Sequence, residues 1–301
     1  MLLALRLDGI RKECKMLIVT MKTLRIYSIL LLIISFSAQL NGQDYKLPDN
    51  KKGLSEITST NGIDKPVTVK VIYDNYVSEE GLKSDWGYSI MIEGLEKVIL
   101  FDTGTRPEIF EFNFKKMGLE ADKVDLIVFS HEHGDHTEGL PAFVKLKKGI
   151  PVIIPYSFSD QFKKKMVTFG LMPVIVKKPA MICNNLYTSG EFDYQIPEQS
   201  LVLNTRNGLV VMTGCSHPGI IGMLREIKSV FGKNIYIVFG GFHLLNKSEK
   251  EMEGIISELR LLGVVKCGAT HCTGEKQIKM IKDAFGANFI EMGAGNTIEI
   301  N

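Results

Sequence analysis

From Pro66 to the C-terminus, segments with strand-like and helix-like patterns follow one another without a break rich in Pro, Gly or Ser. Short apolar runs rich in β-branched residues predict strands, and longer runs with apolar residues at helical spacing predict helices. Strands dominate the first part of this region, and strands and helices then alternate in both halves. The order predicts one α+β domain over residues 66–301, with sheets packed together and helices outside them.

The expected strands are Val67–Tyr73, Ser89–Glu93, Val98–Phe101, Leu126–Ser130, Val152–Pro155, Pro173–Val176, Leu201–Asn204, Leu209–Met212, Ile235–Phe239, Val264–Ala269 and Thr297–Ile300. The expected helices are Pro107–Met117, Thr137–Lys148, Asp160–Phe169, Gly219–Phe231, Ser248–Leu262 and Gly274–Phe285. An Asn-Gly pair at Asn207 and Gly208 is typical of a hairpin between two of these strands.

The first 42 residues form a basic and apolar leader. A positive segment, Met21–Arg25, precedes the apolar run Ile26–Phe36, and small and polar residues follow within residues 35–43. This pattern predicts a signal peptide over about residues 21–42, and therefore a periplasmic or secreted protein. A retained N-terminal anchor is the alternative and would be the only membrane contact; Met16 and Met21 are alternative starts. Residues 43–65 are polar and predict an N-terminal arm.

The charge balance argues against a nucleic-acid partner. The formal net charge is only +2, and residues 1–42 hold six Lys or Arg against two Asp or Glu, so the remainder is slightly acidic. Three lysine groups, at residues 145–148, 163–165 and 177–178, would suit an anionic substrate. Their positions on helices and strand ends favour ordinary solvated faces instead.

Five cysteines leave two interpretations open. Cys14 belongs to the leader, and four cysteines follow it: Cys183, Cys215, Cys267 and Cys272. In an oxidising compartment these four permit three disulfide pairings. Alternatively, most of them are small, buried and unpaired apolar side chains.

Three of the six histidines lie within six residues, as His131, His133 and His136, with Asp135 among them. An apolar, β-rich run precedes this cluster and a predicted helix follows, so a strand-to-helix loop is expected to present it to a cleft. Imidazole nitrogen and carboxylate oxygen are ligands that Zn²⁺ and similar ions accept. Because Gly134 lets the loop turn, the first two histidines can hold one metal ion, while Asp135 and His136 reach a second.

The segment His131–His136 matches the H-x-H-x-D-H motif of the metallo-β-lactamase superfamily, and Phe101–Gly104 resembles the turn that precedes that motif. Three later stretches, Thr213–Gly219, Phe239–Leu244 and Thr270–Gly274, resemble the branch named for 7,8-dihydropterin-6-yl-methyl-4-(β-D-ribofuranosyl)aminobenzene 5'-phosphate synthase, a label also given to hydrolase-like members. The resemblance implies a four-layer αββα sandwich of two packed mixed β-sheets, with helices on the outer faces and the metals at one edge.

The resemblance also implies most of a ligand set for two divalent ions, with zinc as the first candidate and manganese or iron as the others. His131, His133, Asp135 and His136 carry over directly, and His271 matches the final histidine. The chain departs from the common pattern in the middle, where Cys215 stands in place of a bridging aspartate. His217 is the only nearby candidate for a missing nitrogen. A substrate-orienting role for His217 and an inert buried thiol for Cys215 are the alternatives.

Several further residues are expected near the metals. Asp102 is expected to orient a ligand histidine through its free ring N–H. His243 is expected to face the substrate as a catalytic group, or else to be a core histidine. Asp74 and Trp86 lie where the superfamily builds a substrate-side loop, and Trp86 is either a lid or an exposed aromatic residue. Glu132 alternates away from the ligands and is expected either at the surface or behind a ligand as a supporting group.

Together these observations favour an exported, dinuclear-metal-dependent hydrolase that acts on a small molecule. A metal-bound hydroxide, oriented by Asp135, is expected to attack an ester, lactone or phosphoester. Two other classes remain: a transferase that joins a pterin to a phosphoribosyl-type partner, as the branch name suggests, and a non-catalytic metal-binding or ligand-binding protein.

Overall fold

A computed structural model describes residues 46–48 and 62–301 of the chain, and its main feature is a pair of mixed β-sheets. The first sheet has the strand order β13-β1-β2-β3-β4-β5-β6, and the second has the order β12-β11-β10-β9-β8-β7. Each sheet contains parallel and antiparallel pairs, as β3 and β4 run parallel whereas β1 and β2 run antiparallel.

The strands of the first sheet are β1 (Val67–Tyr73), β2 (Ser89–Glu93), β3 (Val98–Phe101), β4 (Val124–Val128), β5 (Pro151–Pro155), β6 (Met172–Val176) and β13 (Thr297–Ile300). Those of the second are β7 (Ala180–Cys183), β8 (Leu186–Thr188), β9 (Leu201–Thr205), β10 (Gly208–Thr213), β11 (Ile235–Gly241) and β12 (Lys266–Thr270). The helices are α3 (Pro107–Lys116), α4 (Gly134–Thr137), α5 (Leu140–Leu146), α6 (Asp160–Thr168), α7 (Ile220–Phe231), α8 (Glu249–Leu261) and α9 (Glu275–Phe285), with short 3₁₀ turns η1 (Ala121–Lys123), η2 (His271–Thr273) and η3 (Gly286–Asn288).

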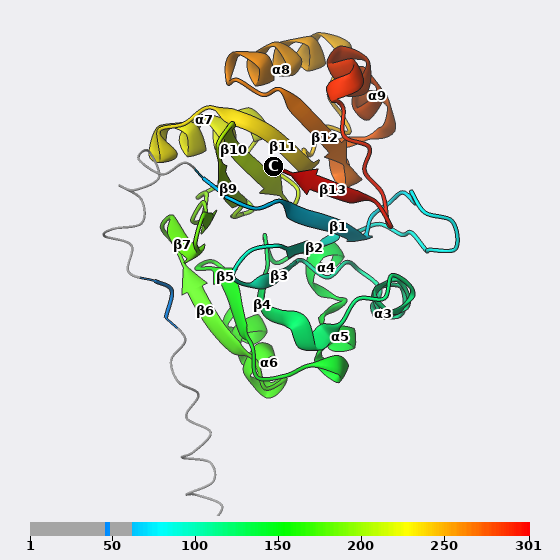
Figure 1. Cartoon of the computed structure of the whole chain (residues 1–301), viewed down its shortest axis with the longest axis vertical. Coiled ribbons are helices and arrows are strands. Elements are labelled where there is room, and N and C mark those ends of the chain that lie inside the picture. The colour runs from blue at the N-terminus through cyan, green and yellow to red at the C-terminus, as the bar shows by residue number, and fades with distance from the viewer. Residues whose placement is uncertain (1–45, 49–61) are drawn as a thin grey trace, which may run out of the picture. The chain divides into compact units, whose positions relative to one another are not determined.

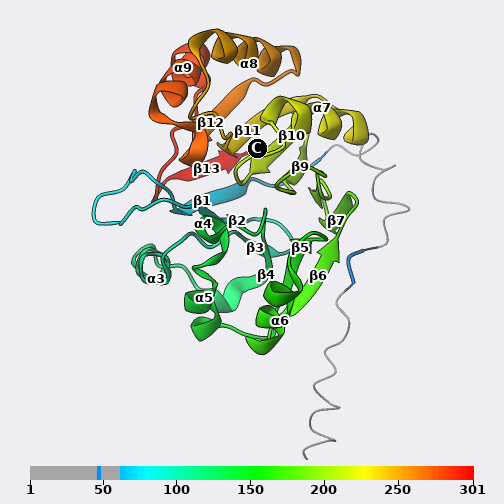
Figure 2. The same ribbon diagram turned by 180° about the vertical axis from the view of Figure 1, so that it is seen from behind.

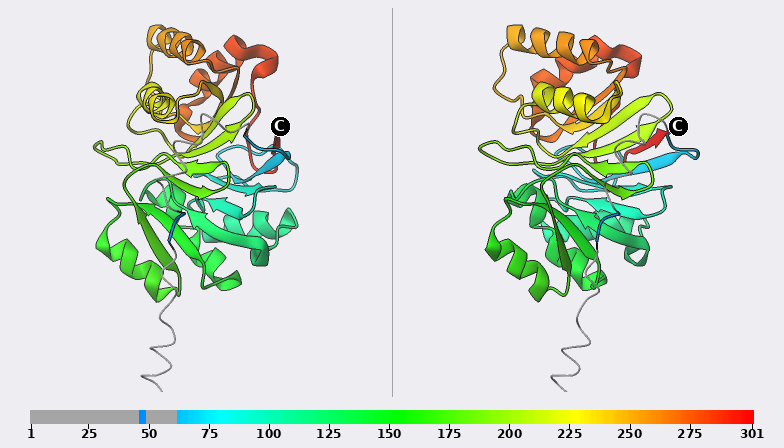
Figure 3. Two further views of the ribbon diagram at one scale, coloured as in Figure 1. Left: turned by 60° about the vertical axis from the view of Figure 1, so that its left-hand side comes forward. Right: turned by 90° about the vertical axis from the view of Figure 1, so that its left-hand side faces the viewer.

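The alternation of side chains along each strand creates three apolar layers. On β10, Val210 and Met212 belong to the core between the sheets. Leu209 and Val211 belong to a second core that also contains buried residues of α7, α8 and α9. A third core joins the outer face of the first sheet to α3, α5 and α6. Figures 1 and 2 show the two groups of helices on opposite sides, and Figure 3 shows the sheets between them, so the predicted four-layer αββα sandwich is confirmed.

Most predicted elements lie close to their observed bounds, but the helix predicted over Thr137–Lys148 is wrong. The chain forms two shorter helices there, α4 and α5, with a break before Leu140. The backbone at Gly139 packs so tightly on Thr103 that a Cβ at this position would lie 1.9 Å from the Thr103 carbonyl oxygen. A proline then stands in the first turn of α5. Asp135 and His136 consequently lie in a short helix rather than in a loop.

Two strands were missed, and one hairpin was predicted correctly. The missed strands, β7 and β8, are only four and three residues long, so neither presents a long alternating pattern. The hairpin is present, since β9 and β10 pair antiparallel with Gly208 opposite Thr205.

The predicted leader, residues 1–42, lies outside the described residues, as does most of the predicted arm. Of the part of the chain that is described, no helix has the length and apolar character needed to cross a membrane.

Candidate metal centre

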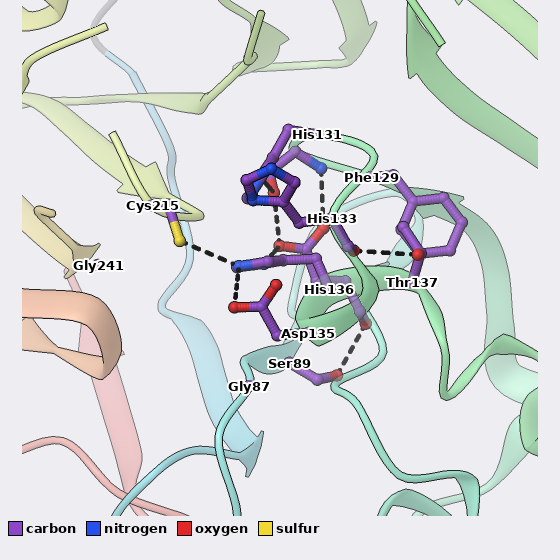
Figure 4. A network of polar contacts seen from close by, with 12 residues as sticks. Gly87, Ser89, Phe129, His131, His133, Asp135, His136, Thr137, Cys215 and Gly241 are labelled. Carbon is purple, nitrogen blue, oxygen red and sulfur yellow. Dashed lines mark hydrogen bonds and ion pairs between the residues drawn. The ribbon is translucent and has the colours of Figure 1, made fainter. Parts of the chain in front are cut away.

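The residues predicted to bind metal gather where strands of both sheets end. His131 follows the end of β4, Cys215 follows β10, and His271 follows β12. Because β10, β11 and β12 run parallel, their carboxyl ends meet at one edge of the second sheet. Figure 4 shows Cys215 facing His136 and Asp135 across this edge.

One group of donors consists of nitrogen alone. His131, His133 and His217 each offer a ring nitrogen, and these three atoms lie within 4.8 Å of one another. The Nε2 atoms of His131 and His217 are 3.2 Å apart. Burial, with the neighbouring imidazoles, holds the pKa of His131 below its ordinary value and lowers the pKa of His217 to about 3. Both rings are therefore neutral and have lone pairs to offer.

A second group mixes oxygen, nitrogen and sulfur: Asp135, His136, Cys215 and His271, whose donor atoms again lie within 4.8 Å of one another. His136 Nε2 is 3.1 Å from Cys215 Sγ and 3.6 Å from Asp135 Oδ2. Burial opposes ionisation of Asp135, but the His271 and His136 imidazoles hold the pKa of its carboxyl below the ordinary value. Burial also opposes a charge on His136, yet the Asp102 and Asp135 carboxylates raise its pKa to about 9. The local field thus favours positive charge.

The buried residue Asp102 connects the nitrogen group of donors to the mixed group. Its Oδ2 atom contacts His136 Nδ1 and accepts a hydrogen bond from Ser130 Oγ, both at 2.7 Å. Ser130 Oγ lies 2.9 Å from His131 Nδ1. The carboxylate therefore fixes the free ring nitrogen of His136 directly and that of His131 through the serine, as expected of a residue that orients ligands.

Glu198 is a supporting residue that sequence reasoning missed. Its fully buried carboxylate accepts hydrogen bonds from the backbone N–H groups of Cys215, Ser216 and His217, at 2.8, 2.9 and 2.9 Å. Three such bonds fix the turn that carries two candidate donors. Glu198 lies in an irregular stretch before β9 and belongs to no motif, so nothing in its neighbourhood could have identified it.

His243 and Cys272 lie beside both groups. Cys215, His217 and His243 form a third set of donor atoms within 4.8 Å of one another, and the His217 and His243 ring centroids are 4.3 Å apart. Cys272 Sγ is 3.5 Å from the Cys215 carbonyl oxygen. A hydrogen bond with Cys272 raises the pKa of His243. All four cysteines of the described chain are buried and free, so the interpretation as unpaired side chains holds and that as disulfides does not.

Trp86 lies over the mixed group. Its indole N–H donates to Asp135 Oδ2 at 2.9 Å, and its ring centroid is 5.1 Å from that of His271. With His243, Cys272 and the segment 245–247, it lines a cavity of about 270 Å³. Asp74 is buried next to the candidate donor His271, where its carboxylate accepts from Thr270 Oγ1 at 2.8 Å. Glu132 turns away from the donors and accepts hydrogen bonds from Ser159.

These residues suit a divalent cation. His271 Nε2 is buried and has no hydrogen-bond partner among the described residues. Asp135 Oδ2 is 3.2 Å away, but this oxygen already accepts from the Trp86 indole. A buried polar atom left unpaired is costly, and a cation between these groups would satisfy it. A cation would likewise explain why the Nε2 atoms of His131 and His217 face each other at 3.2 Å. Imidazole, carboxylate and thiolate together are typical of zinc and related transition metals.

Comparison with known proteins agrees with this geometry. Residues 87–214 match the model of the metallo-beta-lactamase superfamily. The 7,8-dihydropterin-6-methyl-4-(beta-D-ribofuranosyl)-aminobenzene-5'-phosphate synthase of Methanocaldococcus jannaschii is 31% identical over 265 residues, which cover 72% of this chain and 90% of that protein.

Solved structures show the same fold. Tm1679, a metal-dependent hydrolase of the β-lactamase superfamily, is 28% identical with a TM-score of 0.65, over 78% of this chain and 99% of that one. The metallo-beta-lactamase fold protein YhfI from Bacillus subtilis, at 15% identity and a TM-score of 0.58, covers 78% of this chain and 100% of its own and supports the fold alone. The chain belongs to the metallo-β-lactamase superfamily.

Proposed function

We propose that this protein is an exported hydrolase that uses two divalent metal ions, most simply zinc, to cleave an ester, lactone or phosphoester of a small molecule. The observation that supports it most directly is the pair of donor groups, His131/His133/His217 and Asp135/His136/Cys215/His271, side by side next to a cavity. A structural metal site is normally closed by its ligands. Here a cavity of about 270 Å³ is lined by Trp86 and His243, which contact Asp135 and His217 of the two donor groups, and such a space beside the donors supports a catalytic site.

When bound, divalent ions at such a site supply Lewis acidity and make water a better nucleophile. The chain's own residues do the rest. Asp102 and Glu198 hold the donor-bearing segments in place from within the core. Asp135 would bind a metal ion and orient the attacking water, and the Trp86 indole fixes its Oδ2 atom. His243 lines the cavity, where its imidazole can give a proton to a leaving group.

Metal-loaded full-length protein tests the proposal. Protein stripped with a chelator and reloaded with zinc, manganese or iron should hydrolyse a panel of aryl esters, lactones and phosphoesters, and the stripped form should not. The variant His133→Ala should lose turnover and part of the bound metal while its circular dichroism spectrum stays unchanged. Full turnover in the stripped protein, or in this variant, would rule out the metal-dependent mechanism.

A synthase activity is the second candidate, because the relative from Methanocaldococcus jannaschii has that name. Incubation of the loaded protein with a dihydropterin that carries a leaving group, such as diphosphate, on its 6-methyl carbon and with a ribofuranosyl-aminobenzene phosphate, followed by mass spectrometry for the condensed product and the released group, tests it. A condensed product in the absence of ester hydrolysis would favour the synthase.

Export is proposed from the sequence of residues 21–42. N-terminal sequencing of the protein recovered from its native compartment should find a start near residue 43. An intact leader on cytosolic protein would contradict export and would strengthen the case for the synthase.

A further inference from the structure

The cavity beside the candidate metal centre has an apolar wall and a polar rim. It is lined by Trp86, His243, Leu245, Asn246, Lys247 and Cys272. Trp86 and Leu245 form the apolar wall, and 48% and 55% of their surfaces are exposed. Large apolar side chains that stay exposed in a concave site, beside a few polar groups, are typical of a place where a ligand binds.

The Trp86 ring is held in one orientation. Its N–H donates to Asp135 Oδ2 at 2.9 Å, and its carbonyl oxygen accepts from Thr105 Oγ1. The backbone at Gly87 then passes so close to α4 that a Cβ there would lie 2.8 Å from the Asp135 carbonyl oxygen. Figure 4 shows Gly87 next to Asp135. Because the wall is already fixed, little conformational entropy is lost when a flat group stacks on it.

Charged side chains at the cavity contribute less to ligand selection than this apolar wall does. Lys247 Nζ, at the rim, is already paired with Glu251 Oε1 at 2.9 Å. Asn246 adds only a neutral amide. Of the residues that line the cavity, the single lysine is therefore already paired, whereas Trp86 and Leu245 keep much of their apolar surface exposed.

The volume limits what can bind. An apolar cavity of about 150 Å³ accommodates benzene. A cavity of about 270 Å³ thus holds one ring with a short substituent, or two fused rings.

We propose that this cavity binds a flat, apolar part of the substrate, stacked on Trp86 and packed against Leu245. The inference rests on the proposed hydrolase function and names its substrate class: small aryl or conjugated esters rather than short alkyl esters. Trp86 has two roles, as the wall for the ring and as the residue that positions the Asp135 carboxylate.

The chain contains one tryptophan, so its intrinsic fluorescence reports directly on this wall. Zinc-loaded full-length protein is titrated with benzylphosphonate, cyclohexylmethylphosphonate and methylphosphonate, which share an anionic group and differ in the group that would enter the cavity. Benzylphosphonate should change the emission and bind about 5- to 10-fold more tightly than methylphosphonate, with the saturated ring in between. Equal affinities for the three, or no change in emission with any of them, would overturn the proposal.

Two variants separate the ring from its N–H group, with binding measured by calorimetry because the fluorophore is lost. Trp86→Ala should reduce the preference for benzylphosphonate to less than about twofold, whereas Trp86→Phe should retain most of it. In turnover of aryl esters, Trp86→Phe should lower kcat with little change in KM, since only the contact with Asp135 is lost. Phe112→Ala is the matched control, because Phe112 is an exposed aromatic residue of α3 that lies under Lys83 instead of in the cavity. Full ring preference in Trp86→Ala would also overturn the proposal.

The two hypotheses fail in different ways. Ester hydrolysis without any preference for the ring would reject the cavity assignment and leave the hydrolase intact. Ring-selective binding without hydrolysis by zinc-, manganese- or iron-loaded protein would reject the hydrolase and leave the cavity.

Discussion

The two halves of the candidate metal centre are built in different ways. The half on the first sheet draws four donors from six consecutive residues, His131 to His136, in one turn between β4 and α5. The half on the second sheet draws Cys215, His217 and His271 from separate segments after β10 and β12. Local chain geometry places the first set, whereas strand pairing and buried supports place the second. Variants in the two halves should therefore fail differently.

The largest effect is expected in the compact half, which is the half on the first sheet with four donors between His131 and His136. Asp135→Ala removes the only carboxylate among the donors of the mixed group, and turnover should fall by about 10³-fold or more because charge at the reacting centre is no longer balanced. Metal analysis and ester hydrolysis measure this. Glu132→Gln is the matched control, since Glu132 belongs to the same segment but contacts Ser159. A comparable loss in that control would mean that the whole turn, and not its donors, is responsible.

This contrast also explains what the sequence could reveal. The compact half was predicted donor by donor, because a histidine pattern within one turn is visible without knowledge of the fold. The four-layer sandwich was implied by the resemblance to the metallo-β-lactamase superfamily, whereas the bounds of β1, β2 and β3 could be read from their short apolar runs. β7 and β8 were missed because pairing, of β7 with β8 and of β8 with β9, and not their own pattern, makes them strands.

Apart from Asp102, the residues that support the site were not predictable from the sequence. Glu198 binds three backbone N–H groups near residue 216, and Asn75 Oδ1 lies 2.9 Å from His271 Nδ1. Trp86 reaches Asp135 from another loop. Such contacts join residues that are distant in the chain and have no local pattern, so only the folded structure brings them together.

The second-largest effect is expected at Glu198, which supports the half of the centre on the second sheet. Glu198→Gln keeps the shape of the side chain but weakens three charge-assisted hydrogen bonds to the segment 215–217. Zinc affinity should fall about 10- to 100-fold, as it does when groups that orient ligands are altered. A competition assay with a chromogenic chelator measures this. Glu191→Gln changes a half-buried carboxylate that accepts from the Ser157 N–H at 2.6 Å, and it should leave the affinity unchanged. Unchanged affinity in Glu198→Gln would show that the second half is fixed by strand pairing alone.

A smaller effect should decide which thiol belongs to the metal centre. Cys215 Sγ lies 3.1 Å from His136 Nε2, whereas Cys272 Sγ contacts the side chain and carbonyl oxygen of Cys215 and also His243. In cobalt-loaded protein, Cys215→Ser should abolish the thiolate-to-cobalt absorption band and weaken binding about 10-fold. Cys272→Ser should keep the band. The opposite result would move the sulfur ligand from β10 to the turn after β12.

The smallest effect is expected far from both halves, at the lysines of α6. Lys163 lies beside the Tyr156 ring and Lys165 beside Phe162, and the cavity at the metal centre is lined by neither residue. The combined variant Lys163→Gln, Lys164→Gln, Lys165→Gln should therefore change kcat/KM by less than about twofold for an anionic and a neutral aryl ester alike, because exposed charges are strongly screened at physiological salt. Measurement at low and high ionic strength checks the reason as well as the result. A selective loss for the anionic ester at low salt would mean that the positive field of the α6 lysines guides the substrate, although these residues belong to neither half of the metal centre.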